Sequence, residues 1–422
     1  MRKFLFLLAS AASVAACSSS PESEPALGSS QQAIIKGKNS TVDQNAVVLL
    51  VHVDRTQGAF ASCTGTLLAP NLLLTARHCV SSTTEEAFGC DAKGNLLDPS
   101  TGEGNPKLTN AGPDLTPSGF NVFTGTDRPV FFGGKIEVAA KGKKVYHDDA
   151  KVLCSHDLAL ILLDRDIPNA PIMPVRLDAE PTEGETFTAV GWGVTQSTMS
   201  PSKRQQRSGI KVLKVGPVEG SVRKGEEPLP TNDFEVGESI CSGDSGGPAI
   251  SESTNAVIGV VSRGGNNNTA ADPNDPAQRC TDDSSGNVPI VTTNIYTKVA
   301  PFKDIIMQAF ADSGHEPWIE GQPDPRLAKL DDECSANEEC QSNLCVAGKC
   351  VQPCKASSDC SDGKECGTVD GNKMCKNPSP AAATSSSGGG CVAGAAGPTG
   401  TVLPWALAGL ASLVARRRRR AS

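Results

Sequence analysis

Apolar residues in this chain gather in short runs that Gly, Pro, Asn and Asp separate. Residues 46–53 and 158–163 are nearly continuous apolar runs, as expected for strands buried on both faces of a closed barrel. Residues 65–68 and 72–76 flank a Pro-Asn turn, which predicts a hairpin. The pattern therefore favours an all-β domain.

Further strands and one helix are predicted downstream. The strands fall at residues 186–193, 257–262 and 289–299. The helix is indicated by five apolar residues at helical spacing: Phe302, Ile305, Ile306, Ala309 and Phe310. Residues 89–119 and 264–287 are polar, rich in Gly, Pro and Asn, and without a period, so we expect inserted surface loops there. The helix should close the domain by packing on its strands.

Composition and charge narrow the class of protein. With 42 Gly, 29 Pro and only 4% aromatic residues, the chain is typical of a loop-rich secreted β protein. A net charge of -8 argues against a nucleic-acid partner. Sixteen clustered cysteines indicate disulfides and therefore an oxidising compartment.

The N-terminus has the features of an export signal. Residues 1–16 combine a basic start with a short apolar core, which predicts a secretory signal peptide. The sequence before Cys17 resembles the lipobox of bacterial lipoproteins, which implies an acylated Cys17. The alternative is ordinary cleavage after an A-x-A-like site. Residues 17–33 would then be a tether or propeptide, followed by the main domain at 34–318.

A cysteine-rich segment follows a polar linker at residues 319–333. Residues 334–376 contain eight cysteines and resemble two tandem four-cysteine units of the kind found in secreted proteins. So short a segment needs disulfides to fold, and eight cysteines allow 105 pairings. A zinc site is the weaker alternative, because the segment holds no C-x-x-C pair and no histidine.

The C-terminus has the features of a sorting tail. Residues 377–390 form a Gly/Ser linker, and residues 391–422 contain Cys391, an apolar run and five arginines. Together they resemble the myxobacterial sorting tail (MYXO-CTERM), which implies removal near Cys391 and display on the surface of a Gram-negative cell. The alternative is a plain C-terminal membrane anchor. Membrane association through either end is therefore expected.

Glycines on both sides of Ser245 leave its hydroxyl exposed on a sharp turn. The stretch 243–248 also fits the nucleophile elbow of α/β-hydrolases, in which the acid and the histidine follow the serine. Downstream of Ser245, however, the chain has only His315. His78 and Asp157 lie upstream, in the order of the chymotrypsin arrangement.

These residues predict a nucleophilic site. A serine hydroxyl needs an adjacent base, which needs an orienting acid, and His78 and Asp157 can fill these two roles. The backbone N–H groups of Gly243 and Ser245 would bind the oxyanion. His156 is a rival base, but only Asp157 leads directly into an apolar strand, so we expect His156 to face solvent.

Residues 34 to about 314 resemble the trypsin/chymotrypsin-like serine endopeptidases. The matching motifs are Ala76-Arg77-His78-Cys79, Asp157-Leu158-Ala159-Leu160 and Gly243 to Pro248. The resemblance implies a chymotrypsin-like double six-stranded antiparallel β-barrel, a His78-Asp157-Ser245 triad, and no cofactor or metal. It pairs Cys63 with Cys79 and Cys241 with Cys280, which leaves Cys90 and Cys154 as a third pair.

The resemblance also implies activation by cleavage before Ile34, whose freed amine would pair with Asp244. Ala33 precedes Ile34 where the family has a basic residue, which is a departure from the pattern. The residues implied to bind substrate are Ser239, Ser262, Gly264 and Asn294. A neutral floor at Ser239 disfavours basic substrate residues, and Asn294 in place of a glycine should narrow the pocket toward small neutral side chains. Arg263 replaces a common aromatic.

The sequence thus predicts an exported, surface-attached serine endopeptidase, made as a zymogen, that acts on proteins and peptides. One alternative is a catalytically silent homologue that acts as an adhesive or binding protein, although all three triad residues are present. A second is an esterase, which shares the chemistry but does not need a peptide-pairing strand.

Overall fold

The computed structural model describes most of the chain: residues 34–54, 59–84, 88–131, 136–195, 201–220, 227–272 and 275–378. The expected signal peptide, Cys17, and the tail with Cys391 lie outside the described residues. In the described part of the chain, every helix is too short or too polar to cross a membrane.

Six antiparallel strands form a closed barrel in the order β10-β11-β4-β3-β2-β9. They are β2 (Val47–Asp54), β3 (Ala59–Ala69), β4 (Leu72–Thr75), β9 (Phe120–Phe123), β10 (Ala140–Tyr146) and β11 (Ala159–Leu163). The hairpin expected at the Pro-Asn turn joins β3 to β4. All residues of β4 and β11 are buried, as their continuous apolar runs predict.

The second half of the β domain is a sheet of eight strands, in the order β1-β13-β12-β16-β17-β18-β15-β14. The strands are β1 (Lys38–Asn39), β12 (Thr186–Gly191), β13 (Gln205–Lys211), β14 (Lys214–Val215), β15 (Asp233–Val236), β16 (Pro248–Ser251), β17 (Val257–Asn266) and β18 (Thr292–Lys298). Because β14 follows β13 after two residues, the same stretch of chain pairs with β12 on one side and β15 on the other. This continuity brings the two sides of the sheet together in a barrel-like arrangement, here called the second barrel.

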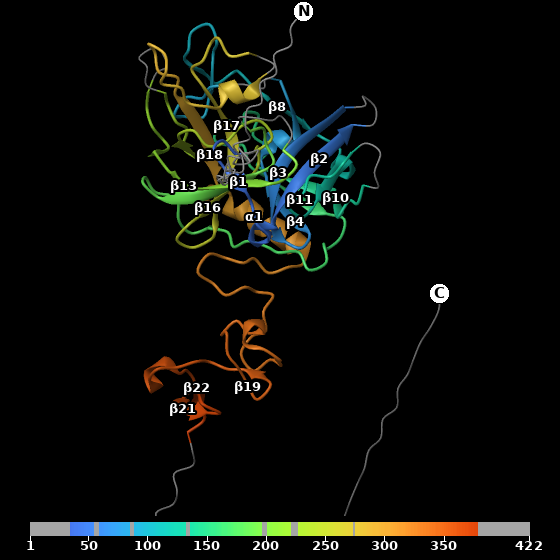
Figure 1. Cartoon of the computed structure of the whole chain (residues 1–422), viewed down its shortest axis with the longest axis vertical. Helices are drawn as coiled ribbons and strands as arrows, with labels where there is room; N and C mark the ends of the chain where they lie inside the picture. Colours follow the sequence, from blue (N-terminus) through green and yellow to red (C-terminus); the bar gives the residue numbers. More distant parts are fainter. Residues whose placement is uncertain are drawn as a thin grey trace, which may run out of the picture.

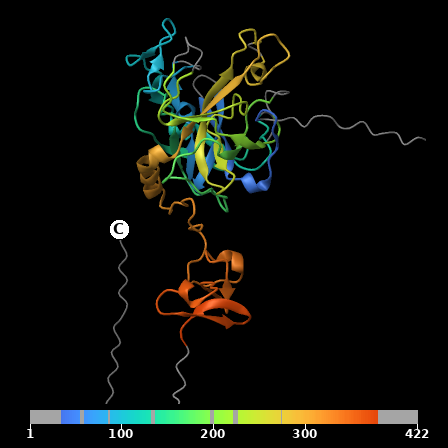
Figure 2. The ribbon, with the colours of Figure 1, turned by 90° about the vertical axis from the view of Figure 1, so that its left-hand side faces the viewer.

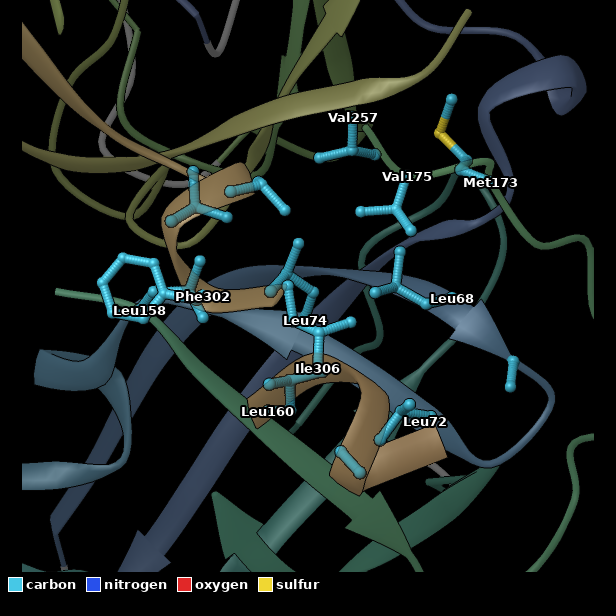
Figure 3. Close-up of a cluster of buried hydrophobic side chains, with 14 of the residues drawn as sticks. Leu68, Leu72, Leu74, Leu158, Leu160, Met173, Val175, Val257, Phe302 and Ile306 are labelled. Atoms are coloured by element: carbon cyan, nitrogen blue, oxygen red, sulfur yellow. The ribbon is translucent and has the colours of Figure 1, made fainter. Parts of the chain in front are cut away.

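A hydrophobic core joins the two barrels to the C-terminal helix α1 (Lys303–Ser313). Figure 3 shows leucines of β3, β4 and β11 in one cluster with Phe302 and Ile306, and Val175 and Val257 above them. Gly314 ends the helix in the left-handed conformation (φ 77°), where its N–H donates to the carbonyl of Phe310. The predicted helix and its packing are therefore present.

The first polar insertion contains regular structure that the sequence did not predict. Its short strands, with β5 just before it, are β5 (Ser81–Thr83), β6 (Leu96–Leu97), β7 (Gly104–Asn105) and β8 (Ala111–Asp114). They form two small sheets, β5 with β8 and β6 with β7. A disulfide between Cys90 and Cys154 ties this insertion to the chain just before β11.

The cysteine-rich segment is drawn as a separate small body below the β domain in Figures 1 and 2. Its two hairpins are built from β19 (Cys345–Val346), β20 (Lys349–Cys350), β21 (Glu365–Val369) and β22 (Asn372–Lys376). The disulfides are Cys334–Cys345, Cys340–Cys350, Cys354–Cys366 and Cys360–Cys375. Each four-cysteine unit therefore pairs its first cysteine with its third and its second with its fourth.

Residues 318–322, here called the strap, leave the β domain in contact with it. Ile319 forms a parallel bridge with Val175, and the carboxylate of Glu320 accepts hydrogen bonds from Nε and Nη2 of Arg176, at 2.7 and 2.8 Å. Arg176 also pairs with Glu185 at 2.9 Å. The first part of the predicted linker is therefore docked on the domain.

Candidate active site

His78 and Asp157 are brought together by two neighbouring strands. β4 runs into the 3-10 turn that carries His78, and β11 begins two residues after Asp157, with Thr75 opposite Ala159. The backbone N–H of His78 donates to Asp157 Oδ1 at 2.9 Å, and Nδ1 lies 2.8 Å from Oδ2. The carboxylate thus holds the ring on Nδ1, and Nε2 is left as the free base.

Asp157 is fully buried and accepts a third hydrogen bond, from Ser262 Oγ at 2.7 Å. Burial alone would raise the pKa of Asp157, but the charge and hydrogen bonds of His78 and the Ser262 hydroxyl lower it below its ordinary value. Burial alone would lower the pKa of His78, but the Asp157 carboxylate raises it above 6.5. The pair is therefore arranged to stabilise a protonated imidazole.

Ser245 lies on a tight turn that packs against the first barrel. Gly243 and Gly246 adopt positive φ values of 95° and 77°, which favour glycine. Thr64 on β3 donates its N–H to the Ser245 carbonyl at 2.8 Å and its hydroxyl to the Gly243 carbonyl at 3.0 Å. A Cβ on Gly246 would come within 2.7 Å of the Ala76 nitrogen, so the turn lies directly against the segment that leads into His78.

The reactive groups of this turn have no partner within the described part of the chain. The Ser245 hydroxyl is not hydrogen-bonded to His78 there, and the N–H groups of Gly243 and Ser245 donate to no acceptor. Both Ser245 and His78 are partly exposed. These groups are therefore free to bind a ligand.

Asn294 links two of the residues expected to bind substrate, Ser239 and Gly264. Asn294 on β18 donates from Nδ2 to the Gly237 carbonyl at 3.0 Å and to Ser239 Oγ at 3.2 Å. Because a carbonyl only accepts, the amide must point its Oδ1 the other way, and a Cβ on Gly264 would lie 2.0 Å from that oxygen. Asn294 thus spans the pocket from the floor at Ser239 to the wall at Gly264.

One edge of β17 is open beside this pocket. β16 pairs with β17 only from Val257 to Val260, whereas β18 pairs with it as far as Asn266. The segment from Ser262 to Gly264 therefore has backbone groups facing the site on the side away from β18. An extended peptide can add to such an edge.

Asp244, next to Ser245, is fully buried among peptide N–H groups. Its carboxylate accepts from the N–H of Gly193 at 2.8 Å and of Cys241 at 3.0 Å. Burial raises the pKa of Asp244 to about 7, although these hydrogen bonds and the charge of Arg128 oppose the rise. Within the described ranges, this carboxyl group therefore has no cation at ion-pair distance.

Ile34 and Ile35 are buried beside the same region. Ile34 packs into the core of the second barrel with Tyr296, and Ile35 packs with Val194 and Cys241. The N–H of Ile35 donates to the Ser239 carbonyl at 2.9 Å. Ile35, the neighbour of the Ile34 named for activation, therefore lies against Ser239 and against Cys241, whose N–H donates to Asp244.

Three disulfides surround the site, and they join the cysteines that the resemblance pairs: Cys63–Cys79, Cys90–Cys154 and Cys241–Cys280. Each group of three possible metal ligands among the described residues contains cysteines that are already in disulfides. These sulfurs are not thiolates, so the groups do not offer a metal site.

A second cluster supports the segments before His78 and Asp157. Asp148 contacts Nδ1 of His156, and its other oxygen lies 3.4 Å from Nη1 of the buried Arg77. His156 was expected to face solvent, but its side chain is only 34% exposed because Asp148 holds it. No local sequence pattern predicts this cluster, because Arg77 and Asp148 are 71 residues apart in the chain.

Comparison with known proteins agrees with this geometry. The trypsin family profile matches residues 116–279, which include Asp157 and Ser245 and begin after His78. A snake venom serine protease of Trimeresurus stejnegeri is 26% identical over 258 residues, which cover 59% of this chain and 82% of the relative. A kallikrein 1-related peptidase of Mus musculus is 27% identical over 48% of this chain and 69% of its own length. A phenoloxidase-activating factor of Holotrichia diomphalia is 29% identical over 63% and 62%. These matches support a trypsin-like serine protease family.

Proposed function

We propose that this chain is a serine endopeptidase that cleaves proteins through an acyl-enzyme on Ser245. The observation that carries the proposal is the His78–Asp157 pair, at 2.8 Å, beside a glycine turn that presents a free serine hydroxyl. Venom relatives at 26% identity are named serine proteases, which supports the same class of reaction.

The proposed reaction uses these residues in two halves. His78 Nε2 takes the proton of Ser245 as the oxygen attacks the substrate carbonyl, and Asp157 stabilises the resulting imidazolium. The N–H groups of Gly243 and Ser245 bind the oxyanion. The imidazolium then protonates the leaving amine, and a water activated by His78 releases the acyl group.

The open edge of β17 favours a peptide over a simple ester as the substrate. An extended peptide can lie antiparallel to the segment from Ser262 to Gly264 and share its backbone hydrogen bonds. An esterase has no use for such an edge.

Pocket geometry supports small neutral side chains at the residue before the cleaved bond. Asn294 lies between Ser239 and Gly264, and the floor residue Ser239 is itself neutral. Asn294→Gly should therefore widen the preference from small residues to larger ones in a peptide library. A wild-type preference for Arg or Lys would contradict this assignment.

We further propose that the enzyme is a zymogen. Cleavage before Ile34 would release an amine one residue before Ile35, which packs against Cys241, the donor of a hydrogen bond to Asp244. Among the described residues, no cation forms an ion pair with the buried Asp244 carboxyl group. The departure at Ala33 means that the activating protease does not need a basic residue at this bond.

We propose that the protein is exported and held at the cell surface. The signal peptide, a lipid on Cys17 and the tail around Cys391 are the expected means, and the venom proteases it resembles are secreted. Once the chain is cut before Ile34, only the C-terminal tail would retain the enzyme. The cysteine-rich segment would space it from the membrane or bind a partner.

A fluorophosphonate probe tests the proposed function directly. The activated chain should be labelled and should hydrolyse casein, and Ser245→Ala should abolish both. Ser242→Ala, the same change at an exposed serine of this turn, should keep both. A correctly cut wild type that neither labels nor cleaves would indicate the silent homologue instead.

A further inference from the structure

Arg263 lies in the part of β17 that pairs with β18 but not with β16. It follows Ser262, whose hydroxyl donates to Asp157, and precedes Gly264 on the open edge. In the proposed antiparallel mode, substrate residues farther N-terminal of the cleaved bond lie beside residues farther along β17. The Arg263 side chain therefore borders the region that receives the second to fourth residues before the bond.

Two segments hold the Arg263 side chain in place. Nη1 lies 2.8 Å from Oδ2 of Asp233, a fully buried residue of β15. The guanidinium carbon lies 5.3 Å from the ring centre of Phe88, which packs beside the Cys90–Cys154 disulfide. A fixed guanidinium loses little conformational entropy when it binds a ligand.

Asp233 and Phe88 hold the Arg263 side chain but leave several of its N–H donors without an acceptor in the described part of the chain. Nη1 is at ion-pair distance from Asp233, and Ser262 Oγ is a more distant contact of the same nitrogen at 3.4 Å. Within the described residues, Nε and Nη2 have no acceptor, although neither is a buried orphan, and the side chain is 13% exposed. Three of the five N–H groups therefore remain for a planar partner such as a carboxylate.

A purely structural role explains this pair poorly. Burying a carboxylate and a guanidinium costs desolvation, and apolar residues of similar size often hold strands as well. Burial raises the pKa of Asp233, which shows that this cost is felt even beside Arg263. A cation beside the unpaired edge of β17 can instead serve to recognise a ligand.

We propose that Arg263 is a specificity residue that binds an acidic side chain of the substrate, two to four residues before the cleaved bond. The preferred substrates would then be acidic segments that end in a small neutral residue. This inference rests on the proposed function and names its substrate class.

Peptides that differ only by Glu, Gln or Lys at these three positions test the inference. At one of them, the activated full chain should prefer Glu over Lys by about tenfold in kcat/KM, the effect of one charge-assisted hydrogen bond. Raising the salt concentration should weaken this preference. Arg263→Lys should retain part of it, Arg263→Gln should abolish it, and Asp233→Asn should enlarge it by freeing the cation.

The double variant Arg263→Gln with Asp233→Asn is a control for misfolding. It removes both charges of the ion pair, so neither is left buried without its partner. It should show no preference for Glu over Lys, and its fluorophosphonate labelling reports whether the site is still assembled. If it retains the wild-type ratio, Arg263 does not bind the substrate and the inference is wrong. Hydrolysis of the Gln peptide and fluorophosphonate labelling report on the proposed function separately, so their loss in the wild type would overturn both.

Discussion

Two buried aspartates flank the serine turn, and their surroundings are opposite. Asp157 meets an imidazole that can become a cation and accepts a hydroxyl hydrogen bond. Asp244 meets two peptide N–H groups, and Arg128 acts on it only as a more distant charge. The pKa of Asp157 is lowered, whereas the pKa of Asp244 is raised to about 7.

The difference teaches that hydrogen bonds from N–H dipoles do not replace a counter-ion. Both carboxyl groups are fully buried, so desolvation acts on each of them. Only the group with a titratable partner keeps its charge easily. We infer that the region of Asp157 is complete in the uncut chain, while the region of Asp244 awaits the cation that cleavage would supply.

Replacing Asp157 should have the largest effect on activity. Asp157→Asn should lower kcat by about 10⁴, because an amide cannot hold His78 in the tautomer that leaves Nε2 as a base. Steady-state hydrolysis of a neutral peptide measures it. Asp164→Asn, just after the same strand β11, is the matched control and should change kcat less than twofold. A loss below tenfold in Asp157→Asn would contradict the assigned role.

Cutting the chain before Ile34 tests whether Asp244 needs a cation for full activity. The new amine should order the turn of Gly243 and Ser245 and raise kcat/KM by about 10² to 10³, the size of an oxyanion-donor effect. A precursor carrying a specific protease site before Ile34 allows the comparison before and after cleavage. Asp244→Asn should erase the gain. Equal activity of cut and uncut chains would show that no amine is required.

Stability of the uncut chain should depend on pH through Asp244. Because its pKa is raised from 3.8 to about 7, the folded state keeps a proton that the unfolded state has lost between these values. The free energy of unfolding should therefore fall as pH rises from about 4 to 7, by up to about 4 kcal/mol. Urea unfolding of the wild type and Asp244→Asn isolates this contribution. Parallel pH curves for the two would exclude it.

The smallest expected effect lies in the pH profile of activity. His78 must lose its proton to act as a base, and Asp157 raises the pKa of His78 above 6.5. We expect the acidic limb of kcat/KM to have its midpoint above 6.5, with activity rising toward higher pH. A midpoint at or below 6.5 would mean that burial outweighs the carboxylate.

A strand could be predicted from the sequence where its own residues carry the pattern, and not where distant strands determine its conformation. β2, β4 and β11 were predicted because their apolar runs reflect burial on both faces. β10 was not predicted, since its sequence AKGKKVY is rich in lysine and glycine, and it becomes a strand by pairing with β9 and β11. Long-range hydrogen bonding decided its conformation.

The residues of the candidate site also differ in whether a local sequence motif predicts them. Ser245, His78 and Asp157 were identified from short motifs and their order along the chain. The partners Asp233 and Asp148 were missed, because each meets its arginine only in the folded state. Arg263 was noticed as a departure from a resemblance, but its ion pair could not be inferred without the pairing of β15 and β18.

The strap gives the molecule a mechanical property. Where the chain leaves the domain, Val175 exchanges backbone hydrogen bonds with Trp318 and Glu320, and the Glu320 carboxylate is held by Arg176. If the enzyme is tethered by its C-terminal end, any pull reaches this junction before it reaches α1. In that case the ion pair and the two hydrogen bonds would share the load, and the β domain would be shielded from the tension.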